Sequence, residues 1–181
     1  MRIFAPLVAL LVLAAGAFAY VERTNPDWYA RMRYPLKYEH IVTGHAKNYD
    51  LDAALLAAVI YRESKFEADA ESSSGAIGLM QLLPDTAKGI ALHTGGAGFR
   101  VADLYEPEIN VRYGSFYLRR LQRKYDDTRL ALAAYNAGQA NVDGWLAAGE
   151  GIPFPETREY VDEVLEIRDI YARAYSDELG Y

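Results

Sequence analysis

A single glutamate, Glu63, occupies a position where the sequence favours acid–base chemistry. It extends an apolar helical stripe within "AALLAAVIYRES" that consists of Leu56, Val59 and Ile60. A carboxyl group on such a stripe is partly desolvated, and desolvation raises its pKa because it disfavours the charged form. A raised pKa lets a carboxylic acid keep its proton near neutral pH, as a general acid must. The alternative is a glutamate at a fraying helix end that points to water beside two basic neighbours.

Two further stretches combine polar residues with features typical of a ligand cleft. In "SSSGAIGLMQLLP", two glycines three residues apart allow the backbone to approach a ligand closely. Gln81 lies there among apolar residues, and a buried amide needs hydrogen-bond partners or faces a cleft. In "ALAAYNAG", Tyr135 and Asn136 end an otherwise apolar helix. Each also fits a purely structural role, Tyr135 as a core tyrosine and Asn136 as a helix-end residue.

The elements that would position these residues are helices. Periodicity and capping patterns predict them at residues 38–49, 53–64, 84–93, 106–125, 129–137, 140–148 and 155–175. Asp52 and Thr128 are expected to be N-caps, and "GAGFRVADLY" is expected to be a loop. The long helix carries one apolar stripe made of Ile109, Tyr113, Phe116, Tyr117 and Leu121. No convincing strand pattern is found, so the sequence predicts a mostly α domain.

The composition excludes several classes of protein. The 181 residues, 51% of them hydrophobic, suit one domain with one core. Without cysteine there is no disulfide and no thiolate ligand or nucleophile. A net charge of −6 argues against a nucleic-acid partner held through its phosphates. The three histidines form no His-Glu-x-x-His pattern, so a zinc site is not expected. There is also no Gly-x-Ser-x-Gly elbow and no phosphate-binding glycine-rich loop.

Three blocks of the chain resemble one family. "ESKFEADAESSSGAIGLMQLLPDTA", then "AAYNAG", then "IPFPETREYV" occur in the order found in the soluble lytic transglycosylase catalytic domain, which is glycoside hydrolase family 23 with a goose-type-lysozyme-like fold. "PEINVRYGSFYL" resembles the family helix that lies between the Gly-Leu-Met-Gln and Ala-Tyr-Asn-Ala-Gly motifs. The resemblance covers about residues 36–176 and implies a lysozyme-like fold.

The first block of the resemblance implies the catalytic group. Glu63 matches the single catalytic acid/base of the family. Ser72 matches a serine nine residues further on, near the sugar N-acetyl group and the catalytic carboxylate. Met80 and Gln81 match the Met-Gln pair that lines the glycan cleft. The sequence departs from many relatives in "ESSSG", where three consecutive serines leave Ser73 and Ser74 as substitutes for Ser72.

The later blocks imply further substrate-binding residues. Tyr135 matches the tyrosine that forms a hydrogen bond at the catalytic centre, and Asn136 beside it supports the loop. Glu156 and Tyr160, both in "ETREYV", match the block that borders the cleft and contacts the peptide stem or the sugar.

The resemblance also implies a reaction on peptidoglycan glycan strands. Glu63 would protonate the bond between N-acetylmuramic acid and N-acetylglucosamine, and the muramic C6 hydroxyl would close onto C1 to give a 1,6-anhydro end. No metal or organic cofactor enters this implied reaction. Ordinary glycosidases use two carboxylates, and no obvious second one is present, because Asp69 lies in a loop and Asp85 in a first helical turn. A lysozyme-like hydrolase and a non-catalytic glycan-binding module remain the alternatives.

The first residues are distinct from the rest of the chain. No charge occurs from Ile3 to Val21, and "AFA" at 17–19 is typical of a signal-peptidase site. The uncharged run is also close to the roughly 20 residues of a membrane span. We therefore predict a signal peptide or membrane anchor at 1–21, a linker at 22–37, a catalytic domain at 38–176 and a C-terminal tail at 177–181. Either role of residues 1–21 puts the domain outside the cytoplasm, with a membrane contact only through this segment.

Overall fold

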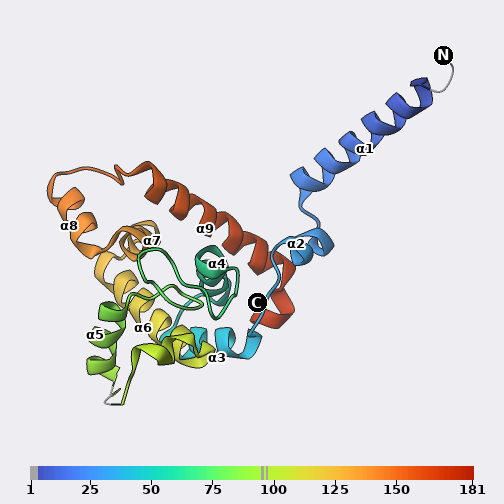
Figure 1. The fold of residues 1–181 in the computed structure, drawn as a ribbon. Coiled ribbons are helices and arrows are strands. Elements are labelled where there is room, and N and C mark those ends of the chain that lie inside the picture. The colour runs from blue at the N-terminus through green and yellow to red at the C-terminus, as the bar shows by residue number, and fades with distance from the viewer. Residues whose placement is uncertain (1–3, 95, 97) are drawn as a thin grey trace. The chain divides into compact units, whose positions relative to one another are not determined.

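The computed structural model describes residues 4–94, 96 and 98–181, drawn in Figure 1. Residues 1–3 of the predicted N-terminal segment and residue 97 of the predicted loop lie outside the described residues. The chain divides into two compact units, Met1–Pro35 and Leu36–Tyr181. We call them the N-terminal unit and the larger unit.

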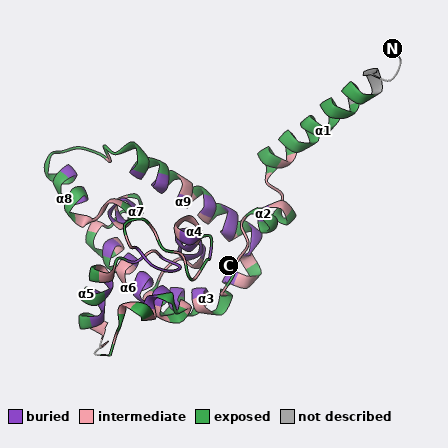
Figure 2. Cartoon of the chain, in the orientation of Figure 1, coloured by how far each residue is buried: buried purple, intermediate pink, exposed green. Residues whose placement is uncertain are grey.

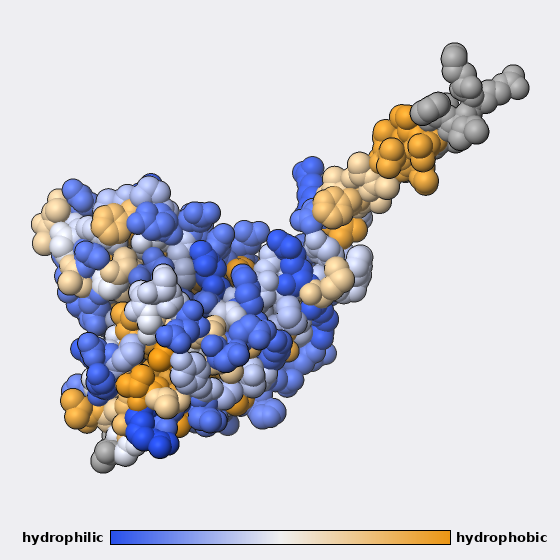
Figure 3. Space-filling view, in the orientation of Figure 1, coloured by the Kyte–Doolittle hydropathy of each residue, from blue (hydrophilic) through white to orange (hydrophobic). Residues whose placement is uncertain are grey.

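The N-terminal unit consists of two helices, α1 (Phe4–Thr24) and α2 (Asp27–Arg33). Large apolar side chains of α1 are exposed, and Figure 3 shows hydrophobic side chains along this helix. Among the residues that the structure describes, no helix combines the length and the hydropathy that a membrane crossing requires. The stretch predicted as a linker is helical over α2, which begins after Pro26, a residue whose fixed φ suits a helix start.

The larger unit is built from helices, as the sequence predicts. They are α3 (Glu39–Tyr49), α4 (Ala53–Ser64), α5 (Pro84–Thr94), α6 (Pro107–Tyr125), α7 (Thr128–Ala137), α8 (Gln139–Ala147), α9 (Pro155–Ala174) and α10 (Ser176–Leu179). The described residues contain no named strand, only two isolated β-bridges that join Ile77 to Glu71 and to Leu82. Part of the predicted loop is a short 3₁₀ helix, η1 (Val101–Tyr105).

The helix α4 is the core of the larger unit. Every residue from Ala54 to Ile60 is buried, as Figure 2 shows, and the helix packs against α9 and α3. The predicted N-cap is confirmed, because the Asp52 side chain accepts a hydrogen bond of 3.1 Å from the Leu55 N–H. Asp52 also accepts bonds of 2.6 and 2.8 Å from Arg168 of α9 and one from the hydroxyl of Tyr181.

Two expectations at helix ends differ from the structure. The N-cap of α7 is Asp127 and not Thr128, because the Asp127 carboxylate accepts bonds from the Arg129 and Leu130 N–H groups at 2.7 and 3.1 Å. The stretch predicted as a C-terminal tail contains α10, and Leu179 is buried there. Burial of Leu179 and the hydrogen bonds that join the Tyr181 hydroxyl to Asp52 and to the Ala54 N–H together hold this short stretch on the larger unit.

Candidate active site

The carboxyl group of Glu63 lies in the last turn of α4 and is partly buried. Its Oε1 atom accepts a hydrogen bond of 2.6 Å from the Tyr160 hydroxyl of α9. Burial raises the pKa of Glu63 to about 7, and the Tyr160 hydrogen bond and the nearby Arg62 charge oppose the rise only in part. The prediction of a raised pKa is therefore confirmed, and Glu63 is protonated over much of the range where a general acid has to act.

A sharp turn follows Glu63 and brings the next loop back to the helix. Lys65 and Phe66 both have left-handed backbone conformations, with φ of 55° and 63°. The Phe66 side chain is buried, which offsets the cost of the strained turn. The Ser64 hydroxyl donates a hydrogen bond of 2.8 Å to the Leu79 carbonyl. The residue directly after Glu63 therefore fastens the glycine-containing loop to the end of α4.

The loop after α4 has no regular secondary structure, and two features keep it compact. They are the backbone conformation of a glycine and the hydrogen bonds of a glutamine side chain. Gly78 has φ of +79°, and a Cβ atom there would lie 2.2 Å from Asn110 Nδ2 and 2.4 Å from the Leu104 carbonyl oxygen. No other residue fits this position. The predicted cleft residue Gln81 is partly buried, and its Nε2 donates to the carbonyls of Ala70 and Gly78 at 3.1 and 3.0 Å. The Gln81 amide thus holds its own loop through its nitrogen.

The residue that fixes this loop to α6 is Asn110, which the sequence analysis did not single out. It is fully buried, and its Oδ1 accepts a bond of 2.8 Å from the Met80 N–H. Its Nδ2 donates to the carbonyls of Ile77 and Leu104 at 2.9 and 2.8 Å. One sequence feature could have indicated this role: Asn110 directly follows Ile109 of the predicted apolar stripe. An amide buried beside such a stripe needs hydrogen-bond partners, and here the loop backbone supplies them.

Met80 is fully buried and packs against α6 where a glycine leaves room for it. A Cβ atom on Gly114 would lie 2.2 Å from the Met80 Sδ atom. The Met80 carbonyl accepts a hydrogen bond of 2.7 Å from the Tyr135 hydroxyl of α7. In this structure the Met80 side chain therefore supports the loop from inside, and its contact with a glycan stays a prediction.

Two tyrosines from different helices lie at the carboxyl group of Glu63. Burial raises the pKa values of Tyr135 and Tyr160 well above the ordinary range, and the negative charge of Glu63 adds to both shifts. Both hydroxyls are therefore neutral donors at any pH where the protein works. Tyr160 donates directly to Glu63, and Tyr135 holds the adjacent loop.

The remaining predicted residues have no described bond to Glu63. The Asn136 amide oxygen accepts a bond of 3.0 Å from Thr157 at the start of α9. Ser72 accepts a bond of 3.0 Å from the Ala76 N–H and lies 2.9 Å from the Ser74 hydroxyl. Glu156 is exposed in the first turn of α9, and no hydrogen bond or ion pair joins it to another described residue. Their roles toward a substrate stay predictions.

The electrostatic surroundings of Glu63 contain one acid only. The groups that shift its pKa are Tyr160 and Arg62, apart from burial itself, and no second carboxylate is among them. In the described part of the chain, no cluster of three or more histidine, cysteine, aspartate or glutamate residues could hold a metal ion. The arrangement is thus one proton donor and acceptor at the end of a buried helix, held by the neutral Tyr160 hydroxyl, with Tyr135 holding the adjacent loop.

These helices and this site define an all-α domain of the lysozyme-like class. The chain belongs to the family described as the Transglycosylase SLT domain, whose family model matches residues 41–151.

Individual relatives agree with this membership. The chain is 36% identical over 155 residues to the soluble lytic murein transglycosylase of Salmonella typhimurium, which covers 79% of this chain and 24% of that protein. It is 33% identical over 166 residues to the membrane-bound lytic murein transglycosylase F of Yersinia pestis, covering 80% of this chain and 32% of that protein.

A solved structure shows the same fold. The 70 kDa soluble lytic transglycosylase of Escherichia coli superposes with a TM-score of 0.76 at 31% identity, over 83% of this chain and 26% of that chain. The chain thus spans between a quarter and a third of the length of these relatives.

Proposed function

We propose that this protein is a peptidoglycan lytic transglycosylase that cleaves the β-1,4 bond between N-acetylmuramic acid and N-acetylglucosamine. The observation that carries the proposal is Glu63, whose pKa of about 7 suits both the donation and the removal of a proton near neutral pH. Family membership and the lytic murein transglycosylase names of the relatives support it. The biological role that follows is remodelling of the cell wall.

The proposed reaction uses Glu63 twice. The protonated carboxyl group first donates its proton to the glycosidic oxygen, and the N-acetyl group of the substrate stabilises the positive charge at C1. The ionised carboxylate then removes the proton of the muramic C6 hydroxyl, whose oxygen forms a bond to C1. The glycosidic bond is broken, a 1,6-anhydro ring is formed, and no water is consumed.

Tyr160 has a defined part in this scheme. Its hydroxyl donates 2.6 Å to Oε1 of Glu63, and a donor at this distance stabilises the ionised state more than the protonated state. It therefore makes the first proton transfer easier by stabilising the carboxylate that this step leaves behind. Tyr160 acts on the catalytic group, and any direct contact with the sugar is a separate prediction, as it is for Ser72, Met80, Gln81, Tyr135, Asn136 and Glu156.

The electrostatics of Glu63 favour the transglycosylase over a lysozyme-like hydrolase. Retaining glycosidases place a second carboxyl group about 5–5.5 Å from the first, and inverting ones place it about 6.5–9.5 Å away. A partner at the shorter distance would add its charge to the causes that raise the pKa of Glu63. No carboxylate charge raises that pKa here, which supports the transglycosylase over a retaining hydrolase.

The test is digestion of purified peptidoglycan by the chain, with Glu63→Gln as the matched control and mass spectrometry of the products. Muropeptides that end in 1,6-anhydro-muramic acid, absent from the control, are the expected result. Reducing ends that are one water heavier would establish the hydrolase instead. If the folded chain binds peptidoglycan specifically but does not cleave it, the protein is a non-catalytic glycan-binding module.

We also propose that residues 1–21 direct the catalytic domain, residues 38–176, out of the cytoplasm as a signal peptide or an anchor. The uncharged run and "AFA" at 17–19 support this, and so does the location of peptidoglycan outside the cytoplasmic membrane. Mass spectrometry of the chain purified from a bacterial host distinguishes the two: cleavage after Ala19 gives a chain that begins at Tyr20. An intact chain that fractionates with cytoplasmic proteins contradicts both.

A further inference from the structure

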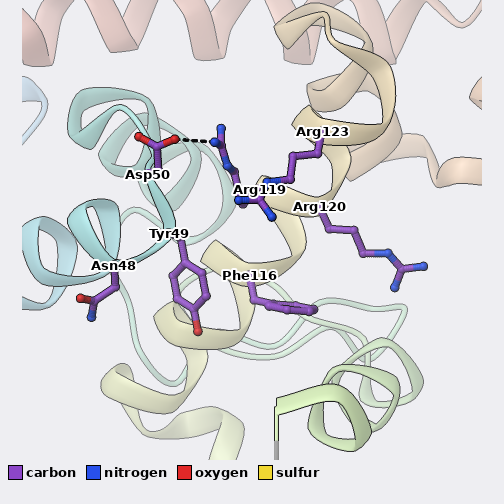
Figure 4. Close-up of a pocket in the computed structure, with 7 residues that line it drawn as sticks. All are labelled: Asn48, Tyr49, Asp50, Phe116, Arg119, Arg120 and Arg123. Atoms are coloured by element: carbon purple, nitrogen blue, oxygen red, sulfur yellow. Dashed lines mark hydrogen bonds and ion pairs between the residues drawn. The ribbon is translucent and has the colours of Figure 1, made fainter.

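A pocket of about 410 Å³ lies between the end of α3 and the middle of α6. Figure 4 shows the residues that line it, which are Asn48, Tyr49, Asp50, Phe116, Arg119, Arg120 and Arg123. Its volume falls in the range of small-molecule sites, about 300–1,000 Å³. None of these residues belongs to the group around Glu63, so the proposed reaction does not account for the pocket.

The charge of this pocket is opposite to that of the chain. Three arginines line it against one carboxylate, Asp50, which leaves an excess of two positive charges in a chain of net charge −6. Arg119 forms an ion pair with Asp50, while the Arg120 side chain points away from that pair (Figure 4). Neither Arg120 nor Arg123 has an ion pair or hydrogen bond to any described residue.

One guanidinium nitrogen in the pocket has an unmet hydrogen bond. The Nε atom of Arg119 is buried and has no partner among the described residues, although the same side chain is held by Asp50. A buried donor without a partner costs stability, and a bound acceptor removes that cost. Arg119 is thus already oriented by Asp50, and its Nε donor is unsatisfied.

The rest of the lining is aromatic. The rings of Tyr49 and Phe116 meet edge to face, with centroids 6.2 Å apart and an angle of 79°. The His45 ring stacks on Tyr49 at 6.0 Å and holds it in place. Ordered aromatic rings next to cationic groups suit a ligand that has an apolar or ring-shaped body attached to its anionic group.

We propose that this pocket binds an organic phosphate, namely a doubly charged phosphate group on an apolar or ring-shaped body. A phosphate monoester carries about −1.5 to −2 charges at neutral pH, which matches the excess of two positive charges. Arginine binds phosphate oxygens through its planar set of donors, and three arginines supply several such donors. A single carboxylate would leave one positive charge uncompensated.

The first test is calorimetric titration of the full chain with phenyl phosphate, beside inorganic phosphate and benzoate. Phenyl phosphate is expected to bind more tightly than either, because only it has both the dianion and the ring. The double variant Arg120→Gln/Arg123→Gln is expected to bind phenyl phosphate at least about tenfold more weakly, since each lost charged contact alone is worth such a factor. Absence of saturable phenyl phosphate binding would overturn the proposal.

A matched control distinguishes binding in this pocket from nonspecific attraction by the net charge of the chain. Lys88→Gln/Arg129→Gln also removes two positive charges, from surface ion pairs with Asp85 and Asp162. This control is expected to bind phenyl phosphate as the unaltered chain does. An equal loss in both double variants would overturn the proposal, and thermal unfolding of each variant shows that it is folded.

A second arm identifies the source of the phosphate. Vesicles of phosphatidylcholine with phosphatidic acid present the same group on a lipid. Co-sedimentation that requires phosphatidic acid and is lost in Arg120→Gln/Arg123→Gln would identify a lipid headgroup. Binding of phenyl phosphate without vesicle binding would identify a free organic phosphate.

Discussion

Replacing the carboxyl group of Glu63 by a neutral amide should stabilise the protein in a way that depends on pH. The pKa of Glu63 is 4.5 in an exposed chain and about 7 in the fold. Between these values the folded chain binds more protons than the unfolded chain, so the stability of the unaltered protein falls as pH rises. Glu63→Gln has no such proton and avoids this loss.

The size of the effect follows from the shift. Each pKa unit corresponds to about 1.36 kcal/mol, so a shift of this size amounts to roughly 3 kcal/mol. The advantage of Glu63→Gln should be near zero below pH 4.5, grow between pH 4.5 and 7, and stay constant above that. For a chain of this length, it corresponds to a rise of roughly 6–12 °C in Tm at pH 8.

Thermal and urea unfolding at pH 4, 6 and 8 measures this difference. The amide oxygen introduced by Glu63→Gln can still accept the Tyr160 hydrogen bond, so the comparison isolates the charge. Glu150→Gln, at an exposed carboxylate with no side-chain hydrogen bond or ion pair to a described residue, controls for the general loss of one negative charge. A stability difference that does not change with pH would refute the argument that burial holds the Glu63 proton.

Three other substitutions test the positions of neighbouring groups. Tyr160→Phe removes the hydrogen bond that stabilises ionised Glu63, so the rate should fall by about tenfold and the alkaline limb of the pH–rate profile should move to higher pH; an unmoved limb would contradict this role. Asn110→Leu leaves the Met80 N–H and the Leu104 carbonyl buried without their partner, while the Ile77 carbonyl keeps the Leu82 N–H, and should cost roughly 2–3 kcal/mol or more in urea unfolding; a near-neutral change would show that water replaces the amide. Gly78→Ala should lower the free energy of unfolding by about 1–3 kcal/mol more than Gly75→Ala does. Both glycines have positive φ, but only Gly78 lies against Asn110 and the Leu104 carbonyl. Equal losses would mean that the loop moves away from α6.

The local features of the fold could be predicted because they depend on neighbouring residues. The apolar run before Glu63, the Asp52 cap and the proline before α9 each act within one or two helical turns. The raised pKa of Glu63 also followed from its own helix, since the stripe that buries it precedes it directly. At Thr128 the same reasoning chose the wrong one of two adjacent capping residues.

The contacts between distant segments could not be predicted from local pattern. Tyr160 lies 97 residues after Glu63, and no local rule pairs the two. Asn110 is 30 residues from Met80, and a polar residue in a helix usually indicates an exposed face. Only the assembled helices show that its amide replaces the missing partners of the loop backbone. The apolar stripe predicted for α6 likewise does not include Gly114. The role of this glycine is to leave space for the Met80 side chain.

The way the loop after α4 is fastened determines where the chain can change in length. From Leu79 onward its backbone is tied to Ser64, Asn110 and Tyr135, which belong to three different helices. An extra residue in that stretch would break several of these bonds at once. The exposed serines at 73 and 74 carry no such ties to a helix, so insertions there leave the acid in place. The outer tip of this loop can therefore change in length while the chemistry at Glu63 stays the same.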